Sequence, residues 1–193
     1  MAAEHLAKVI VIGGGIGGLA AALALAKEGV QVELLEKASQ IGEIGAGIQL
    51  GANAFNALDA LGVGEVARNR SVFTQHLRMM DAIDANPIVE IDVGAAYQAR
   101  FGNPYAVIHR ADLHSCILEA VEKNENISFK ISTEVCEIRQ DEKGVTAIDQ
   151  HGTEHTADAL IGCDGVRSVV RDSIVGDEVK VTGHVVYRAV VDV

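Results

Sequence analysis

The sequence predicts an α/β fold in which a parallel sheet is joined by a separate antiparallel one. Three observations lead to this prediction. Residues 9–12 are a short apolar run that precedes a glycine-rich turn, a helical pattern at 16–27 and a second apolar run at 32–35, which is the order strand, helix, strand. Residues 107–131 again give strand, helix and strand. Residues 76–92 instead give two strands around a short polar turn, which indicates a hairpin and a second sheet.

Composition limits the possible class of protein. A chain of 193 residues that is 49% hydrophobic can bury one substantial core, and its net charge of −11 argues against nucleic acid or an anionic membrane as a partner. The apolar runs are too short to span a bilayer, and we expect no signal peptide before the first strand. Cys116, Cys136 and Cys163 are scattered, which favours reduced thiols in the cytoplasm and no metal site. His151 and His155 are expected in a solvated turn.

The glycine-rich turn is the most informative motif in the chain. Gly13 permits a tight turn after the first strand, Gly15 allows a pyrophosphate to approach the backbone, and Gly18 lets the helix pack close to the strand. The helix then directs its N–H groups and positive dipole end at the phosphates. The alternative is a glycine-rich turn in an α/β protein that binds nothing.

Glu36 adds a second component of the same site. It lies 18 residues after Gly18 (36 − 18), at the end of the second strand. A carboxylate there can accept both hydroxyls of an adenosine ribose, and it would repel a 2′-phosphate. The sequence therefore predicts a Rossmann-like dinucleotide-binding domain that does not hold NADP in this site.

Two further positions have the right residue type for a ligand. Asp164 follows an apolar strand and precedes a helix, where open α/β sheets bind ligands, and it could accept a ribose or ribityl hydroxyl. Arg110 stands at a strand-to-helix turn and could point at a phosphate or a flavin edge; a surface salt bridge is the alternative. The glycine cluster in residues 38–50 is expected to be a loop lying flat against a ring system, or else a mobile loop.

The other expected elements are a helix at 53–61, a polar loop at 94–106, strands at 135–139 and 145–148 that form a hairpin, a strand at 156–163, a helix from 164 to about 176, and a long strand at 179–193.

Three of these motifs, in this order along the chain, resemble the class A (single-component) FAD-dependent aromatic hydroxylases. They are the glycine turn with Glu36, the segment Gly45-Ala46-Gly47-Ile48-Gln49, and Asp164-Gly165-x-x-Ser168-x-x-Arg171. Within that family the stretches GAGIQLGANA and YAVIHRADLH are most similar to salicylate hydroxylases and 3-hydroxybenzoate 6-hydroxylases. The resemblance implies a three-layer FAD-binding domain of the glutathione-reductase type at 1–70 and 107–178. It also implies part of an interleaved antiparallel substrate-domain sheet at 71–106 and 179–193.

The resemblance also implies site residues. Those for FAD are Gly13, Gly15, Ile16, Gly18, Glu36, Lys37, Gly47, Gln49, Arg110, Val135 and Asp164. Tyr187 and Arg188 are candidates for the substrate side, and Arg100 or Arg188 could meet a substrate carboxylate, although both could equally be ordinary surface or sheet-edge arginines. The remaining catalytic residues are expected beyond residue 193, because family members are about twice this length. We therefore expect an N-terminal portion of a longer protein.

The implied reaction is hydroxylation of a phenolic aromatic acid, such as 3-hydroxybenzoate or salicylate, by dioxygen. NADH or NADPH would reduce FAD, and a flavin C4a-hydroperoxide would transfer one oxygen atom, without any metal. The expected partners are the aromatic substrate, dioxygen, the missing C-terminal half and possibly a second copy of the chain. The alternatives are another FAD-dependent oxidoreductase on the same scaffold, or an inactive nucleotide-binding fragment.

Overall fold

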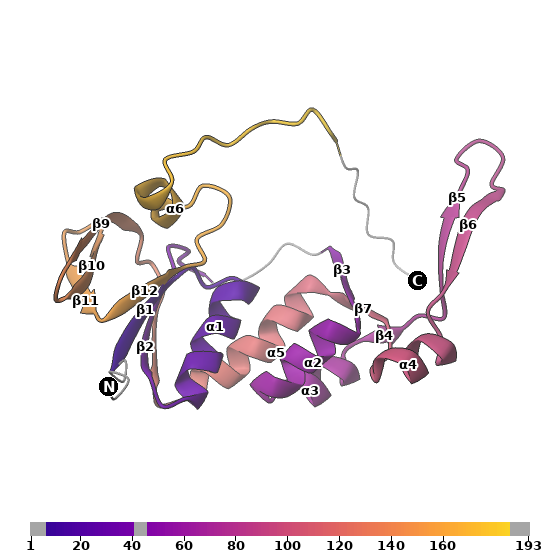
Figure 1. The fold of residues 1–193 in the computed structure, drawn as a ribbon, viewed down its shortest axis with the longest axis horizontal. Helices are drawn as coiled ribbons and strands as arrows, with labels where there is room; N and C mark the ends of the chain where they lie inside the picture. The colour runs from indigo at the N-terminus through magenta and orange to yellow at the C-terminus, as the bar shows by residue number, and fades with distance from the viewer. Residues whose placement is uncertain (1–6, 41–45, 186–193) are drawn as a thin grey trace. The chain divides into compact units, whose positions relative to one another are not determined.

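The computed structural model describes residues 7–40 and 46–185 (Figure 1). The chain divides into two compact units, one formed by Met1–Gly42 and Ile117–Val193, the other by Glu43–Cys116. Helix α5 (Arg110–Glu122) begins in the second unit and ends in the first. The units are described separately below.

The regular elements of the first unit, apart from the end of α5, are β1 (Lys8–Ile12), α1 (Ile16–Lys27), β2 (Gln31–Leu35), β8 (Ile127–Lys130), β9 (Val135–Asp141), β10 (Gly144–Asp149), β11 (Glu154–Ala157), β12 (Ala159–Gly162) and α6 (Val169–Ile174).

A parallel sheet with the strand order β12-β1-β2-β8 organises the first unit. In its register Ile12 lies opposite both Leu35 and Gly162, so three neighbouring strands end at the same level. The turns that follow these strands therefore share one edge of the sheet. This is the edge at which open α/β sheets bind ligands.

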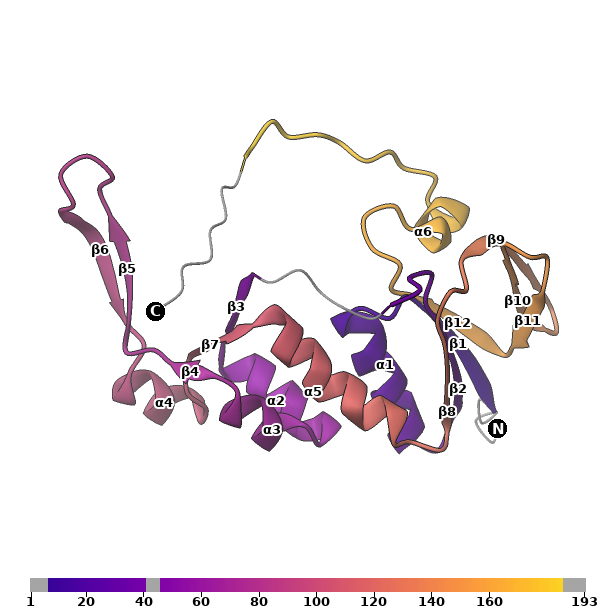
Figure 2. The ribbon, with the colours of Figure 1, turned by 180° about the vertical axis from the view of Figure 1, so that it is seen from behind.

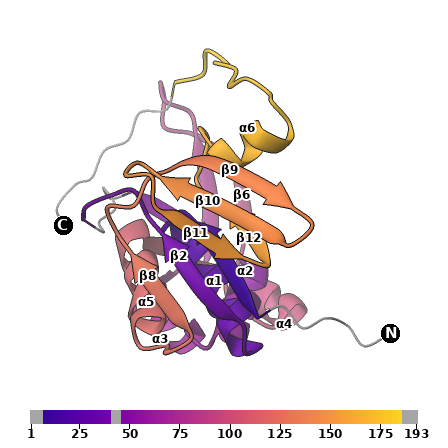
Figure 3. The ribbon, with the colours of Figure 1, turned by 90° about the vertical axis from the view of Figure 1, so that its left-hand side faces the viewer.

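Side-chain alternation along β1 explains the layers on either side of this sheet. Helix α1 packs against β1 and β2, and Val9 and Val11 are buried. On the other face Ile10 and Ile12 join a core cluster that includes Val135 of β9. The antiparallel sheet β11-β10-β9 covers that face, as Figure 3 shows. The order helix, parallel sheet, antiparallel sheet confirms the three-layer FAD-binding fold predicted from the sequence.

Three expectations for the first unit were wrong. The single strand expected at 156–163 is interrupted at Asp158, so that β11 and β12 belong to different sheets. The Asp158 carboxylate accepts the backbone N–H groups of Ala7 and Lys8, which fixes the chain as it crosses between layers. The strand expected at 179–193 is not formed over residues 179–185; the rest of it lies outside the described residues. The helix expected from 164 begins only at Val169, after a loop.

The elements of the second unit, with α5 already given, are β3 (Gly47–Leu50), α2 (Ala52–Leu61), α3 (Gly64–Asn69), β4 (Val72–Phe73), β5 (His76–Met80), β6 (Pro87–Asp92), α4 (Ala95–Phe101) and β7 (Ala106–His109).

The second unit contains a small antiparallel sheet, β3-β7-β4, and α2, which contacts β3 and α3 (Figure 2). Phe55 and Leu58 of α2 are buried, as is Ile108 of β7. Gly62 adopts φ +83° and ends α2, as the sequence indicates for a helix C-terminus. Gly47–Leu50 was expected to be loop, but it pairs with β7 as a strand.

The predicted hairpin is confirmed as β5 and β6, which pair only with each other among the described strands. Apolar side chains on it are exposed: Met79 is 59% exposed and Ile91 is 52% exposed. After the hairpin, the expectation of a polar loop at 94–106 was wrong, because residues 95–101 form α4. Tyr97 and Phe101, one helical turn apart, pack with ring centroids separated by 4.7 Å, and Gly102 ends the helix with φ +81°.

None of the helices in residues 7–40 and 46–185 is both long and apolar enough to cross a membrane.

Candidate dinucleotide site

The glycine turn after β1 has the geometry that its sequence predicts. Gly13 adopts φ +105°, and its N–H donates to the carbonyl oxygen of Leu35 at 2.8 Å. A Cβ at Gly13 would collide with the backbone carbonyl of Cys163, on the neighbouring strand. A Cβ at Gly18 would collide with the carbonyl oxygen of Gly13. These two glycines are therefore required by packing of the turn itself.

Gly15 has a different environment from the other two glycines. It is the N-cap of α1, and a Cβ there would meet nothing within 4 Å. No side chain caps the helix, and its first turn contains no acidic residue. The first N–H groups of a helix have no acceptor within the helix, so an anion can approach them here over a bare backbone.

Glu36 follows β2 at the same edge of the sheet. Its Oε2 accepts the N–H of Gly14 at 2.6 Å, and its Oε1 accepts the N–H of Ala38 at 2.7 Å. Each carboxylate oxygen has about two acceptor positions, so one position on each oxygen remains for a donor such as a ribose hydroxyl. The residue is partly buried, and its orientation is fixed by two backbone groups before any ligand arrives.

Asp164 follows β12 and is held by the helix after it. Its Oδ2 accepts the N–H of Val169 at 2.7 Å and the N–H of Val170 at 3.3 Å. The hydroxyl of Ser168 donates to Oδ1 at 2.5 Å and accepts the N–H of Arg171. The aspartate, serine and arginine of the motif thus shape the start of α6. One acceptor position on Oδ1 remains for a ligand hydroxyl.

Val135 begins β9 close to the segment that follows β2. The N–H of Thr133 donates to the carbonyl of Glu36 at 2.9 Å, and the N–H of Ser132 donates to the carbonyl of Ala38 at 3.0 Å. Val135 itself is buried in the cluster with Ile12. The first unit therefore brings together the glycine turn, Glu36, Val135 and Asp164, whereas Lys37 is exposed beside Glu36.

In the second unit, Gly47 and Gln49 lie on β3 two residues apart and so project to one face of the sheet. A Cβ at Gly47 would meet nothing within 4 Å. The hydroxyl of Tyr105 donates to the Oε1 atom of Gln49 at 2.8 Å, and the Gln49 side chain, which also carries two amide N–H donors, is exposed.

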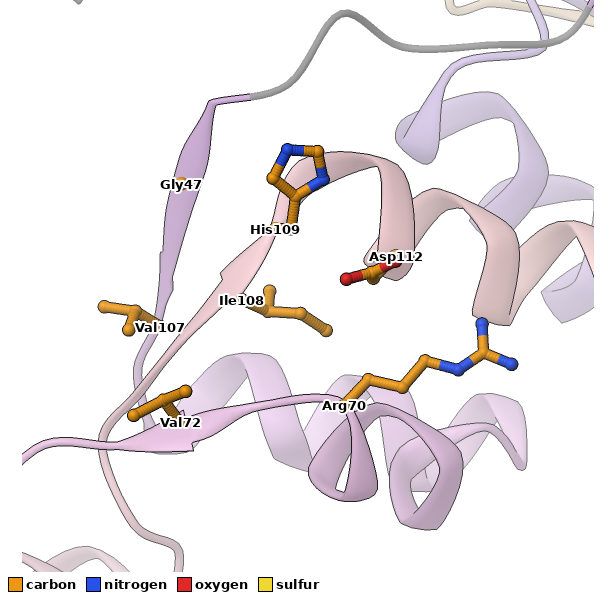
Figure 4. A pocket seen from close by; sticks show the side chains of 7 residues that line it. All are labelled: Gly47, Arg70, Val72, Val107, Ile108, His109 and Asp112. Carbon is orange, nitrogen blue, oxygen red and sulfur yellow. The ribbon is translucent and has the colours of Figure 1, made fainter. Parts of the chain in front are cut away.

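A pocket of about 320 Å³ opens beside this face, with Gly47 and His109 on its wall (Figure 4). Arg70 reaches it from the residue after α3, and Asp112 reaches it from the first turn of α5. The remaining lining is apolar, from Val72, Val107 and Ile108. Arg110 is exposed next to this pocket, and its N–H donates to the carbonyl of Ala46 at 3.0 Å.

The substrate-side candidates receive little support. Tyr187 and Arg188 lie outside the described residues. Arg100 lies on α4 with its guanidinium 5.2 Å from the ring centre of Phe101, an ordinary surface arrangement. Within residues 7–40 and 46–185, no three His, Cys, Asp or Glu side chains are grouped as a metal site would need.

Sequence reasoning missed the groups that orient the predicted residues. The N–H groups of Gly14 and Ala38 on Glu36, and the hydroxyl of Tyr105 on Gln49, have no signal in the sequence. The sequence-based expectation that His155 lies in a solvated turn was also wrong, because its side chain is only 6% exposed. His151 is exposed, as expected.

The fold and the glycine turn with Glu36 define a dinucleotide-binding α/β protein. The profile of the FAD-binding domain family matches residues 6–193. The chain belongs to this family, and FAD is its cofactor.

Similar proteins agree with this assignment. The chain is 58% identical over 185 residues to 3-hydroxybenzoate 6-hydroxylase of Klebsiella oxytoca, an alignment that covers 96% of this chain and 47% of that protein. It is 59% identical over 184 residues to 3-hydroxybenzoate 6-hydroxylase of Polaromonas naphthalenivorans, with coverage of 95% and 46%. The chain thus spans about half the length of these relatives.

Among solved structures, HpxO of Klebsiella pneumoniae (R204Q variant) complexed with FAD matches with a TM-score of 0.77 and 27% identity, over 89% of this chain and 43% of that one. A 2-methyl-3-hydroxypyridine-5-carboxylic acid oxygenase matches with a TM-score of 0.75 and 29% identity, over 88% and 42%.

The residues of the first unit fit the cofactor. FAD needs an anion-binding helix end, a backbone that a pyrophosphate can approach, and an acceptor for the ribose hydroxyls. The uncapped N-terminus of α1, the open position at Gly15 and the two free acceptor positions of Glu36 supply these.

Proposed function

We propose that this chain is the FAD-binding part of a monooxygenase that uses FAD and NADH or NADPH to hydroxylate a hydroxybenzoate, with 3-hydroxybenzoate as the substrate. The observation that supports this most directly is the identity of 58–59% to two 3-hydroxybenzoate 6-hydroxylases, extending over nearly the whole chain. The glycine turn and Glu36 supply the cofactor site that such an enzyme requires.

Within the first unit we assign each residue one task. The N–H groups of Gly15 and Ile16 donate to the pyrophosphate, and Gly13 and Gly18 keep the turn tight enough for those groups to converge. Glu36 accepts the hydroxyls of the adenosine ribose. These charge-assisted hydrogen bonds each contribute on the order of 1.5–3 kcal/mol.

The other residues of this unit act around that centre. Lys37 lies beside the adenosine end, and the backbone of Val135 contacts the adenine. Asp164 uses its remaining acceptor position for a hydroxyl of the FAD chain while its other positions hold α6. Because the same carboxylate serves both tasks, α6 and the cofactor are expected to order one another.

For the second unit we separately propose contacts with the flavin end. Gly47 gives a bare backbone against which a flat ring can lie, and Gln49 presents amide N–H groups that Tyr105 has oriented. Arg110 is assigned to the flavin or its phosphates; the exposed position at the start of α5 supports this.

The chemistry that FAD supplies when bound is acceptance of a hydride from NADH or NADPH and activation of dioxygen for hydroxylation of a phenolic ring. The protein binds and orients the cofactor and excludes water from the reacting ring. In 3-hydroxybenzoate, position 6 is para to the hydroxyl, which donates electron density there, so the expected product is 2,5-dihydroxybenzoate.

We further propose that a C-terminal half of the same polypeptide completes the substrate domain. The exposed apolar hairpin β5–β6 supports this, because a two-stranded hairpin is marginally stable by itself and would gain partners from a larger sheet. Tyr187 and Arg188 are placed on the substrate side. A homodimer is proposed on the family resemblance alone. A cytoplasmic location is supported by the free thiols of Cys116, Cys136 and Cys163.

The test is oxygen incorporation by the longer polypeptide that contains this chain. With NADH, 3-hydroxybenzoate and isotopically labelled dioxygen, we expect one labelled oxygen in 2,5-dihydroxybenzoate. Oxidation of NADH without labelled product would instead favour another FAD-dependent oxidoreductase. Binding of FAD without any NADH oxidation would favour a nucleotide-binding fragment and overturn the proposal.

A further inference from the structure

A buried cluster of charged side chains lies in the first unit, away from the glycine turn. Glu33 of β2 is 6% exposed, and its carboxylate contacts Lys8 at 2.6 Å and Lys130 at 2.7 Å. The ring of His155, also 6% exposed, lies 2.8 Å from the Oε1 atom of Glu33 through Nδ1. Its Nε2 lies 3.4 Å from the Oδ2 atom of Asp149, which is 8% exposed. The imidazole therefore stands between two buried carboxylates.

Both carboxylates are ionised at neutral pH. Burial alone would raise the pKa of the Glu33 carboxyl, but its hydrogen bonds from the two lysines and the histidine outweigh burial and lower that pKa to about 2. Burial would likewise raise the pKa of Asp149, yet two backbone N–H donors of the following turn and the His155 ring lower it to about 2. An ionised carboxylate only accepts hydrogen bonds. Each ring nitrogen of His155 therefore faces a buried oxygen that can only accept a hydrogen bond.

The cluster connects two layers of the fold. Glu33 belongs to the parallel sheet, whereas His155 and Asp149 belong to the antiparallel sheet β11-β10-β9. The apolar cluster around Ile12 and Val135 joins the same two layers. Ser132 and Thr133 lie in the connection between β8 and β9, and their backbone bonds hold the start of that connection against the segment that begins at Glu36. Glu33 lies on β2, and Glu36 follows the end of that strand three residues later.

We propose that His155 is a positioning residue: its ring bridges Glu33 and Asp149, and so holds the antiparallel sheet against β2 and keeps the segments of Glu36 and Val135 in register for the adenosine end of the cofactor. The connection to FAD rests on the proposed function; the clamp itself does not.

A simpler role explains only part of the cluster. Asp149 also accepts the N–H groups of His151 and Thr153, so closing the turn between β10 and β11 would account for it alone. Turn closure requires neither a buried histidine nor a buried Glu33. A buried ion pair is also weak support for stability in itself, because apolar side chains of similar volume often serve as well. What an apolar pair cannot provide is a hydrogen bond to each carboxylate, and these two contacts fix the ring between Glu33 and Asp149.

The experiment compares His155→Gln with His151→Gln in the same chain. The control changes an exposed histidine four residues away, whose recorded bond to Asp149 comes from its backbone. The readouts are the thermal midpoint at neutral pH and hydrogen exchange of the Ser132 and Thr133 amides. The charged groups in contact with the ring are Glu33 and Asp149, and Glu33 in turn contacts Lys8 and Lys130.

We expect His155→Gln to lower the midpoint by roughly 6–20 °C, because the bridge between the two buried carboxylates is lost, and His151→Gln to leave it nearly unchanged. Exchange at Ser132 and Thr133 should rise by on the order of 10-fold or more in His155→Gln, because the connection that leads from β8 into the antiparallel sheet is no longer held.

An unchanged thermal midpoint in His155→Gln would overturn the bridge between the two carboxylates. Unchanged exchange at Ser132 and Thr133 would overturn the positioning role. Both readouts are made without FAD, so failure of the proposed function shows itself separately, as absence of FAD binding in the unmodified chain. If the chain binds FAD, affinity should fall in His155→Gln and not in His151→Gln; equal affinities would also count against positioning.

Discussion

The carboxylate of Glu36 accepts the N–H of Gly14 at 2.6 Å, so the acid at the end of the second strand is bonded directly to the glycine turn after the first. The two parts of the predicted dinucleotide site are thus one hydrogen-bonded unit before any ligand is present. The same carboxylate also accepts the N–H of Ala38. Its orientation is therefore set by the protein rather than by the cofactor, which lowers the cost of ordering on binding.

Replacement of Glu36 by Gln tests this arrangement. The amide has a single oxygen, so one of the two backbone N–H groups loses its acceptor and the ribose loses a charge-assisted bond. We expect FAD affinity to fall by roughly 10- to 100-fold, measured by quenching of flavin fluorescence. Glu28→Gln is the matched control, because this exposed glutamate lies at the C-terminal end of α1, away from the glycine turn; equal losses in the two variants would contradict the role given to Glu36.

Substitutions at two glycines of the turn distinguish a side chain that blocks the ligand from one that disrupts the packing of the fold. Gly15→Val adds a side chain where nothing lies within 4 Å, so we expect the thermal midpoint to change little while FAD affinity falls at least ~10-fold. Gly18→Ala places a methyl group against the carbonyl of Gly13 and should unfold or strongly destabilise the chain. Retained FAD affinity in Gly15→Val would show that the pyrophosphate binds elsewhere.

Asp164 has a structural task that must be distinguished from ligand binding. Asp164→Ala removes the acceptor for the N–H groups of Val169 and Val170, so we expect faster hydrogen exchange in α6 and weaker FAD binding. Ser168→Ala removes the N-cap of α6, at a cost of about 1 kcal/mol, and leaves the Asp164 carboxylate in place. Its FAD affinity should stay close to that of the unmodified chain. If both variants lose FAD equally, capping alone explains the motif.

The buried Glu33 carboxylate predicts sensitivity to acid. Its pKa is lowered from 4.5 to about 2, so its contribution to stability is complete above about pH 5 and is lost as the pH falls towards 2. The difference corresponds to on the order of 3 kcal/mol. Glu33→Gln should lose this contribution at neutral pH and flatten the acid limb of the unfolding free energy measured in urea. Identical pH profiles for the two proteins would contradict the assignment.

Much of the first unit could be predicted because its signals are local. Strands buried on both faces read as short apolar runs, and each glycine of the turn has a steric reason that holds in any such turn. The hairpin β5–β6 could also be predicted from the sequence, because the stretch between its two strands contains the turn-favouring residues Asp84 and Asn86, followed by Pro87. The helix α4 was not predicted, because its seven residues are too few to show a clear helical period. The packing of Tyr97 on Phe101 and the stop at Gly102 reveal it.

The sequence by itself determined the α/β class with its strand–helix–strand order, the glycine turn and the choice of Glu36, because backbone sterics and hydrophobic pattern act over a few neighbouring residues. The three-layer type followed from the resemblance to the family. The tertiary structure alone decided that β11 and β12 part at Asp158, that Gly14 and Ala38 orient Glu36, and that His155 is buried. These depend on contacts between residues far apart in the chain: Glu33 and His155 are separated by 122 positions. A polar side chain such as that of His155 is solvated or buried between two carboxylates depending on which layers of the fold pack together. A local sequence pattern does not contain that information.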